Sequence, residues 1–216
     1  MTDHPDSKLI PRGLFVMTVL YGGMTVIAGV LGFKQVALGP LAVEAGIFPF
    51  LMLVVLSSSV SQFYGRDQAN KLVLWGFLPL AASIFLILIV LGLPPSDKMP
   101  VENINAFETV LNQTPRIMAA GPFAYGVSLF LNVYIFDRLR GRGGDGNVAM
   151  MVRGGIASAI SQAIDSVIFI TLAFYGEFPI GSLLAGQMLA KVVLSFIIVP
   201  PLVFGMVSLA KALDDK

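Results

Sequence analysis

Two charged residues stand inside runs of the chain that are otherwise free of charge. Asp165 lies between Gly154 and Gly176, and Lys191 lies in the run 178–210. A charge at the middle of a membrane-spanning helix costs about 2.5–3.5 kcal/mol on insertion scales, so such residues usually face the interior of a bundle and bind something. The two residues therefore predict either a ligand site or a buried salt bridge that only joins two helices.

Uncharged polar side chains accompany both charges at helical spacing, where they share one face of a helix. The polar positions of four apolar runs are Ser57, Ser58, Ser59, Ser61 and Gln62; Tyr125, Ser128 and Asn132; Ser158, Ser161, Gln162, Asp165 and Ser166; and Gln187, Lys191 and Ser195. One shared polar cavity explains all four faces at once. Hydrogen bonding and close packing between helices is the alternative explanation, and it suits the serines best.

Residue types needed for catalysis are missing. The sequence has no cysteine and one histidine, His4, in a polar N-terminal tail. This excludes thiolate chemistry and argues against a histidine metal site or a Ser–His pair. Nucleotide-binding motifs and a nucleophile elbow are absent, and Asp145–Met150 only begins like the CDP-alcohol phosphotransferase signature. We predict no catalytic residue, no metal, no cofactor and no enzyme activity; the net charge of +1 argues against nucleic acid.

The elements that position these residues follow from composition. Hydrophobic residues make up 56% of the 216 residues and charged ones 12%, against about 25% in a typical soluble domain. The chain is predicted to be an all-α polytopic membrane protein with six transmembrane helices in a single membrane domain, residues 1–216. The expected spans are 13–33, 45–65, 72–93, 117–136, 154–176 and 180–210.

The last span is too long for a membrane. A helix over 178–210 would be near 50 Å at 1.5 Å per residue, against a hydrocarbon core of about 30 Å. We expect part of it to be a loop, to project beyond the core, or to bend at Pro200-Pro201. In the connection 94–116, apolar residues recur every three or four positions, at Val101, Ile104, Phe107 and Leu111. This spacing predicts a short interfacial helix, either a lid or a plain surface connector.

The distribution of basic residues predicts the orientation. With a cytoplasmic N-terminus, the inside segments hold Lys8, Arg12, Arg66, Lys71, Arg138, Arg140, Arg142, Arg153, Lys211 and Lys216. The outside segments then hold Lys34, Lys98 and Arg116. Because cytoplasmic loops carry the excess of Lys and Arg, both termini are expected to be cytoplasmic.

Several segments together resemble the VUT (YhhQ-type) family of bacterial queuosine-precursor transporters. The resemblance covers about residues 25–205, with matching order, spacing and helix count. It is carried by Gly46–Phe50 leading to Phe63–Arg66, Ala124-Tyr125 to Asn132–Phe136, Ile160–Phe169 with Ala173–Gly176, and Lys191 followed by Pro200-Pro201.

The resemblance implies a fold similar to the substrate-binding subunits of ECF vitamin importers. It also implies uptake of 7-cyano-7-deazaguanine or 7-aminomethyl-7-deazaguanine across the bacterial inner membrane. A carboxylate accepts the amide N–H and exocyclic amine of a guanine-like edge, and aromatic faces stack on the ring. The substrate-binding residues this implies are Asp165, Gln162, Lys191, Asn132, Ser58, Ser161, Phe50 and Tyr125.

The chain departs from the family pattern in its polar set. Ser58 stands where members usually carry an aspartate, and Leu129 and Asn132 replace a glutamine and an aspartate. The substrate is therefore either a queuosine precursor or a similar small nitrogen heterocycle.

Other functions remain open at this stage. The chain is alternatively a substrate-binding subunit that docks on a separate energising module, a lipid-modifying membrane enzyme, or a structural subunit. Its expected partners are the heterocycle and the lipid bilayer, and a second copy of the chain or an energising subunit is a further candidate partner.

Overall fold

The protein is built almost entirely of helices. The structure is a computed structural model that describes residues 10–32, 34–38, 41–112, 115–140, 146–176 and 180–215. Its helices are α1 (Arg12–Leu31), α2 (Ile47–Tyr64), α3 (Arg66–Leu91), α4 (Val101–Leu111), α5 (Pro115–Arg140), α6 (Asn147–Phe174) and α7 (Gly181–Asp214). Two short strands, β1 (Gln35–Leu38) and β2 (Leu41–Glu44), complete the described elements.

The six predicted spans overlap α1, α2, α3, α5, α6 and α7. Among the described residues, five helices are long and apolar enough to cross a membrane: α1, α2, α3, α6 and the stretch Leu184–Asp214 of α7. The predicted helix in the connection 94–116 is confirmed as α4. That α5 is a sixth span, and that the chain is one membrane domain, stay predictions.

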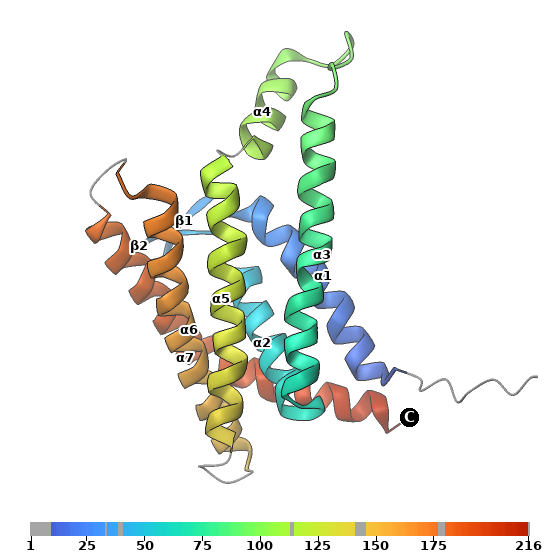
Figure 1. Ribbon diagram of the computed structural model, residues 1–216, viewed down its shortest axis with the longest axis vertical. Coiled ribbons are helices and arrows are strands. Elements are labelled where there is room, and N and C mark those ends of the chain that lie inside the picture. Colours follow the sequence, from blue (N-terminus) through green and yellow to red (C-terminus); the bar gives the residue numbers. More distant parts are fainter. Residues whose placement is uncertain are drawn as a thin grey trace, which may run out of the picture.

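Helix α2 is the centre of the bundle. It packs against α1, α3, α5 and α7, while α6 lies along both α5 and α7 (Figure 1). In α2, 72% of the most apolar window is buried, against 11% in α3. The outer face of α3 instead exposes large apolar side chains such as Trp75 and Phe85, as expected of a helix that faces lipid.

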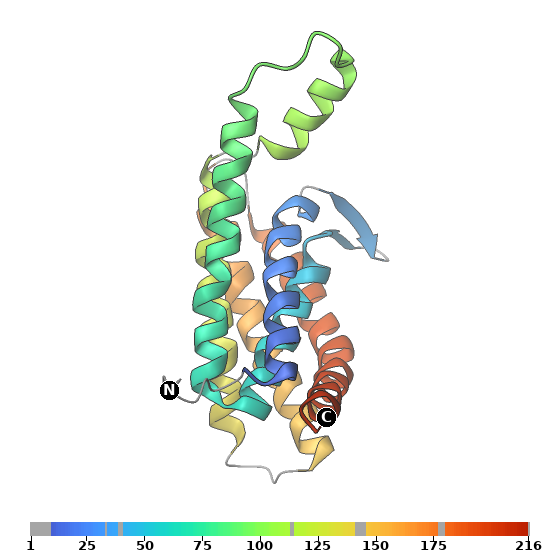
Figure 2. The same cartoon turned by 90° about the vertical axis from the view of Figure 1, so that its right-hand side faces the viewer.

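The chain reverses between α2 and α3 over one residue. Gly65 has φ 92°, a left-handed conformation that glycine adopts at no steric cost. The end of α2 is therefore followed directly by the start of α3. Helix α3 then runs past the rest of the bundle and, with α4, forms a projection at one end of the molecule (Figure 2).

The predicted all-α fold is confirmed, and one short hairpin lies between α1 and α2. Strands β1 and β2 pair antiparallel, with Val36 opposite Val43 and Leu38 opposite Leu41. The backbone N–H of Ala45 also donates to the Lys34 carbonyl at 2.7 Å, which closes the base of the hairpin. Each strand has four residues, three of them apolar in succession (Val36–Leu38 and Leu41–Val43), so there is no apolar–polar alternation from which the sequence pattern could predict a strand.

The helix ends also differ from the expected ones. Helix α7 is continuous over its 34 residues and stays helical through Pro200-Pro201, so no part of it is a loop. Its course turns toward the C-terminal end (Figure 1). Helix α6 begins at Asn147, earlier than the expected 154. Arg153, whose charge set the expected start of the span, is a buried residue within the helix.

Candidate substrate cavity

A cavity of about 460 Å³ opens between the helices at the end of the bundle that carries α4 and the hairpin. We call this the cavity end. Each of α1 to α7 contributes to the lining, which includes Thr25, Phe50, Tyr125, Asp165, Gln187 and Lys191. Its volume lies within the range of about 300–1,000 Å³ that is common for small-molecule sites.

The charged pair stands in the wall of this cavity. Lys191 Nζ donates to Asp165 Oδ2 at 2.6 Å. Ser128 Oγ lies 3.3 Å from Asp165 Oδ1 and 3.1 Å from the Tyr125 carbonyl, and its single proton serves one of these two acceptors. Both charged side chains are largely buried, with exposed fractions of 7% for Asp165 and 12% for Lys191. Helices α5, α6 and α7 thus meet at one carboxylate whose two oxygens keep lone pairs for a further donor.

Aromatic rings lie next to the pair. Phe50 and Tyr125 meet edge to face at 5.5 Å between centroids, and Phe77 meets Tyr125 in the same way at 5.8 Å. The Lys191 ammonium lies 5.4 Å from the centroid of the Phe50 ring, close enough for a cation–π contact. The cavity therefore combines a carboxylate, an ammonium and flat apolar faces.

Hydroxyl groups from α1 complete the wall. Thr25 Oγ1 donates to the backbone carbonyl of Tyr21 at 2.8 Å and lies 3.3 Å from the Tyr125 hydroxyl. The Tyr125 hydroxyl in turn donates to the side-chain hydroxyl of Tyr21 at 3.2 Å. Sequence reasoning did not single out Thr25. The available signal was its spacing of four from Tyr21, which places two polar groups on one face of α1.

The predicted site residues form two groups, one that lines the cavity and one that does not. Asp165, Lys191, Phe50 and Tyr125 line the cavity. Gln162, Asn132, Ser58 and Ser161 do not line it and are completely buried in the packed interior. Asn132 Nδ2 donates to Ser58 Oγ at 2.9 Å and to Ser57 Oγ at 3.3 Å, which joins α5 to α2.

The α4 segment lies at the mouth of the cavity. Val110, Leu111 and Asn112 contribute to its lining, whereas most of α4 is exposed and none of its residues is buried. The helix covers part of the opening with its C-terminal turn. This contact is what the lid interpretation requires.

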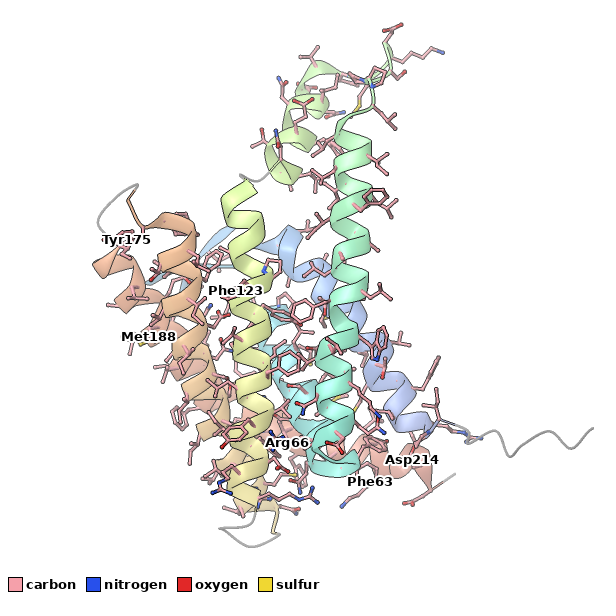
Figure 3. The ribbon with its side chains drawn as sticks, viewed as in Figure 1. Phe63, Arg66, Phe123, Tyr175, Met188 and Asp214 are labelled. Atoms are coloured by element: carbon pink, nitrogen blue, oxygen red, sulfur yellow. The ribbon has the colours of Figure 1, made fainter. Side chains whose placement is uncertain are left out.

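The opposite end of the bundle is closed by polar contacts. Tyr64 Oη donates to Asp214 Oδ2 and the Gly13 amide donates to Asp214 Oδ1, both at 2.8 Å. Arg153 Nη2 lies 3.5 Å from Gln62 Oε1. We call this the basic end, and Figure 3 shows Arg66, Phe63 and Asp214 gathered there, far from α4.

A smaller cavity of about 240 Å³ lies at the basic end. It is lined by Gln62, Phe63, Arg140, Asn147, Met150, Phe204, Val207, Ser208 and Lys211. The basic residues predicted to be cytoplasmic occupy this end as far as they are described; Lys8, Arg142 and Lys216, with His4 and Asp145, lie outside the described residues. In the part of the chain that the structure describes, no three acidic, His or Cys side chains gather to hold a metal ion.

Comparison with known proteins gives the chain a family. The sequence pattern of the family described as "Putative vitamin uptake transporter" matches residues 44–205. The chain belongs to this family. Residues 44–205 cover all the cavity-lining parts of α2 to α7, so the α1 wall with Thr25 lies outside the family match.

A curated relative supports the assignment. The chain is 29% identical over 167 residues to a Bacillus subtilis (strain 168) protein described as "Probable queuosine precursor transporter", and the alignment covers 77% of this chain and 70% of the relative. No solved structure matches the chain significantly. Membership of the vitamin uptake transporter family makes this a multi-pass membrane transporter of a small molecule and not an enzyme, as the sequence predicted.

Proposed function

We propose that this transporter takes up a queuosine precursor, 7-cyano-7-deazaguanine or 7-aminomethyl-7-deazaguanine, or a similar small nitrogen heterocycle, across the bacterial inner membrane. The observation that carries the proposal is the Asp165 carboxylate in the cavity wall, paired with Lys191 beside the rings of Phe50 and Tyr125. The description of the Bacillus subtilis relative points to the same substrate class.

The recognition chemistry follows from the donors and acceptors. The guanine-like edge of a deazapurine presents an N–H and an amino group in parallel, and a carboxylate accepts both. Lys191 can then donate to the ligand carbonyl while it remains near Asp165. Phe50 and Tyr125 offer the flat faces on which a planar ring stacks.

The proposed orientation puts the cavity end outside and the basic end in the cytoplasm. The concentration of Arg and Lys at the basic end supports it, since cytoplasmic segments carry the excess of basic residues. Both termini are then cytoplasmic, and α1, α2, α3, α5, α6 and α7 are the six spans of one membrane domain. Helices α5 and α3 both have 26 residues, which supports α5 as a span. The resemblance to ECF substrate-binding subunits implies such a bundle.

Alternating exposure of the cavity is the proposed mechanism. The open cavity end and the contacts of Asp214 and Arg153 at the basic end correspond to an outward-facing state. Release inward requires these contacts to separate. The chain then acts as a facilitator or secondary transporter, because its sequence encodes no nucleotide-binding motif.

Uptake by purified protein in proteoliposomes tests the proposal. We expect saturable uptake of labelled 7-cyano-7-deazaguanine, and a loss of at least about tenfold in Asp165→Asn because a charge-assisted contact is removed. Asp67→Asn, which changes an exposed carboxylate in the first turn of α3, should transport at the wild-type rate. Binding without uptake would instead favour a subunit that needs an energising module, and neither binding nor uptake would contradict the proposed substrate.

A further inference from the structure

A second set of polar atoms lies below the cavity, with no partner. Among the described residues, the buried side-chain atoms without a hydrogen bond include Asn132 Oδ1, Ser158 Oγ, Ser195 Oγ and both amide atoms of Gln162. We call these four residues the polar layer. All four are buried, and Gln162 is 0% exposed.

Helix register places the polar layer on the far side of the charged pair from the cavity mouth. Ser128 and Lys191 both contact Asp165. Asn132 lies one turn after Ser128, and Ser195 lies one turn after Lys191. Gln162 lies almost one turn before Asp165, and Ser158 lies one further turn before Gln162. Because α6 runs opposite to α5 and α7, all these steps lead toward the basic end (Figure 1).

The hydrogen bonds of neighbouring groups fix the direction of the free atoms. Ser57 Oγ donates to the Val54 carbonyl, so it must accept from Asn132 Nδ2. The Asn132 carbonyl oxygen is therefore turned away from α2. The hydroxyls of Ser161 and Ser166 donate hydrogen bonds to backbone carbonyls of their own helix, as buried helical serines commonly do. Ser158 and Ser195 make no such bond.

Unpaired polar atoms in a membrane bundle are costly, so their retention calls for a ligand or a second state. Gln162 presents one donor and one acceptor side by side, the complement of a lactam edge with its N–H and C=O. The Ser195 hydroxyl, one turn from Lys191, and the Ser158 hydroxyl, one turn deeper than Gln162, can each donate or accept. Because the polar layer holds no charge, it suits a neutral ligand.

We propose that the polar layer is a second binding station, which takes the neutral lactam edge of the transported heterocycle after it leaves Asp165. The station rests on the proposed function. It lies between the cavity and the closing contacts of the basic end, so a ligand that leaves Asp165 passes the station before it is released inward. The cavity then supplies affinity, and the polar layer lowers the barrier to inward release.

The station predicts that binding and transport respond separately to Gln162→Leu. The unpaired amide is removed, so the unfolding midpoint should equal or exceed that of the wild type. Affinity for 7-cyano-7-deazaguanine should stay within about twofold because the cavity is unchanged, whereas uptake into proteoliposomes should fall by about tenfold or more. Ser195→Ala should show the same separation, and Ser166→Ala, whose hydroxyl bonds its own helix, should bind and transport normally.

The other possible results would each contradict the second station, the placement of Gln162 or the proposed function. Wild-type uptake by Gln162→Leu and Ser195→Ala would overturn the station, as would a lowered unfolding midpoint, which would make Gln162 a structural contact. An equal loss of affinity and uptake would place Gln162 in the cavity site. If the wild type itself does not bind the heterocycle, the proposed function fails, and the station fails with it.

Discussion

At the scale of single residues, the decisive feature is a carboxylate that three helices share. Asp165 accepts from Lys191 at 2.6 Å and lies 3.3 Å from Ser128 Oγ. A buried ion pair can be replaced by apolar groups at little cost in stability, whereas breaking it from one side leaves an uncompensated charge. A pair that lines a cavity is therefore better explained by ligand binding than by stability.

Single and double substitutions of the pair should separate these two roles. Lys191→Met leaves the Asp165 carboxylate unpaired and should lower the free energy of unfolding by about 3–5 kcal/mol. The double variant Asp165→Asn/Lys191→Met should recover most of that loss yet fail to bind the heterocycle. Chemical denaturation in detergent measures the first effect and ligand titration the second. A double variant as unstable as the single one would show that the pair is structural.

At the scale of elements, the cavity wall depends on close packing between α1 and α3. A Cβ atom built on Gly76 of α3 would overlap the Tyr21 ring of α1. Tyr21 is completely buried, and its hydroxyl accepts from the Tyr125 hydroxyl of the cavity wall. The glycine thus allows the approach that positions the aromatic side of the site.

Gly76→Ala should disturb both packing and binding. Overpacking typically costs about 1–3 kcal/mol of unfolding free energy, and displacement of Tyr21 should also weaken ligand binding through Tyr125. Gly23→Ala is the matched control, since nothing lies within 4 Å of a Cβ there. It should leave stability equal or slightly higher, by up to about 1 kcal/mol. Equal behaviour of the two variants in thermal unfolding would refute this packing argument.

The helices could be predicted from the sequence because long apolar runs leave few alternatives in a membrane protein. The helix ends could not be predicted, because a run without charges marks the part of a helix that lies in the lipid core, and the helix itself can extend further. Arg153 illustrates this: it is buried within α6, where its guanidinium contacts the Arg140 carbonyl at 3.3 Å. Asp165 and Lys191 could be predicted as site residues because they are charges in apolar runs. That Gln162 and Asn132 lie outside the cavity depends on how the helices are aligned and rotated against one another, which cannot be predicted from a single sequence.

At the scale of the whole molecule, the two ends differ in chemistry and in closure. The cavity end is open and lined by aromatic and polar groups, while the basic end is held by bonds that reach across the chain. Asp214 near the C-terminus binds both Gly13 and Tyr64 through its two oxygens. One carboxylate therefore fastens α7 to the start of α1 and the end of α2.

Loss of that carboxylate should open the basic end. Because Asp214 is exposed, a bond to its carboxylate is worth up to about 1 kcal/mol, so Asp214→Asn should raise the population of the open state by about fivefold. Because the chain has no cysteine, Ser61→Cys gives a single reporter in the buried part of α2. Its labelling by a thiol reagent added at the cytoplasmic side should quicken in Asp214→Asn and stay unchanged in Asp215→Asn. Equal rates in both would contradict a closing role for Asp214.

The substrate site at Asp165 can be tested by the unfolding midpoint of the purified protein titrated with 7-cyano-7-deazaguanine, for the wild type and for Asp165→Asn/Lys191→Met. A ligand at a hundredfold its dissociation constant stabilises the folded state by about 2.7 kcal/mol. We predict a midpoint that rises with ligand concentration in the wild type and stays constant in the double variant. A flat wild-type titration, or the same rise in both proteins, would contradict a substrate site at Asp165.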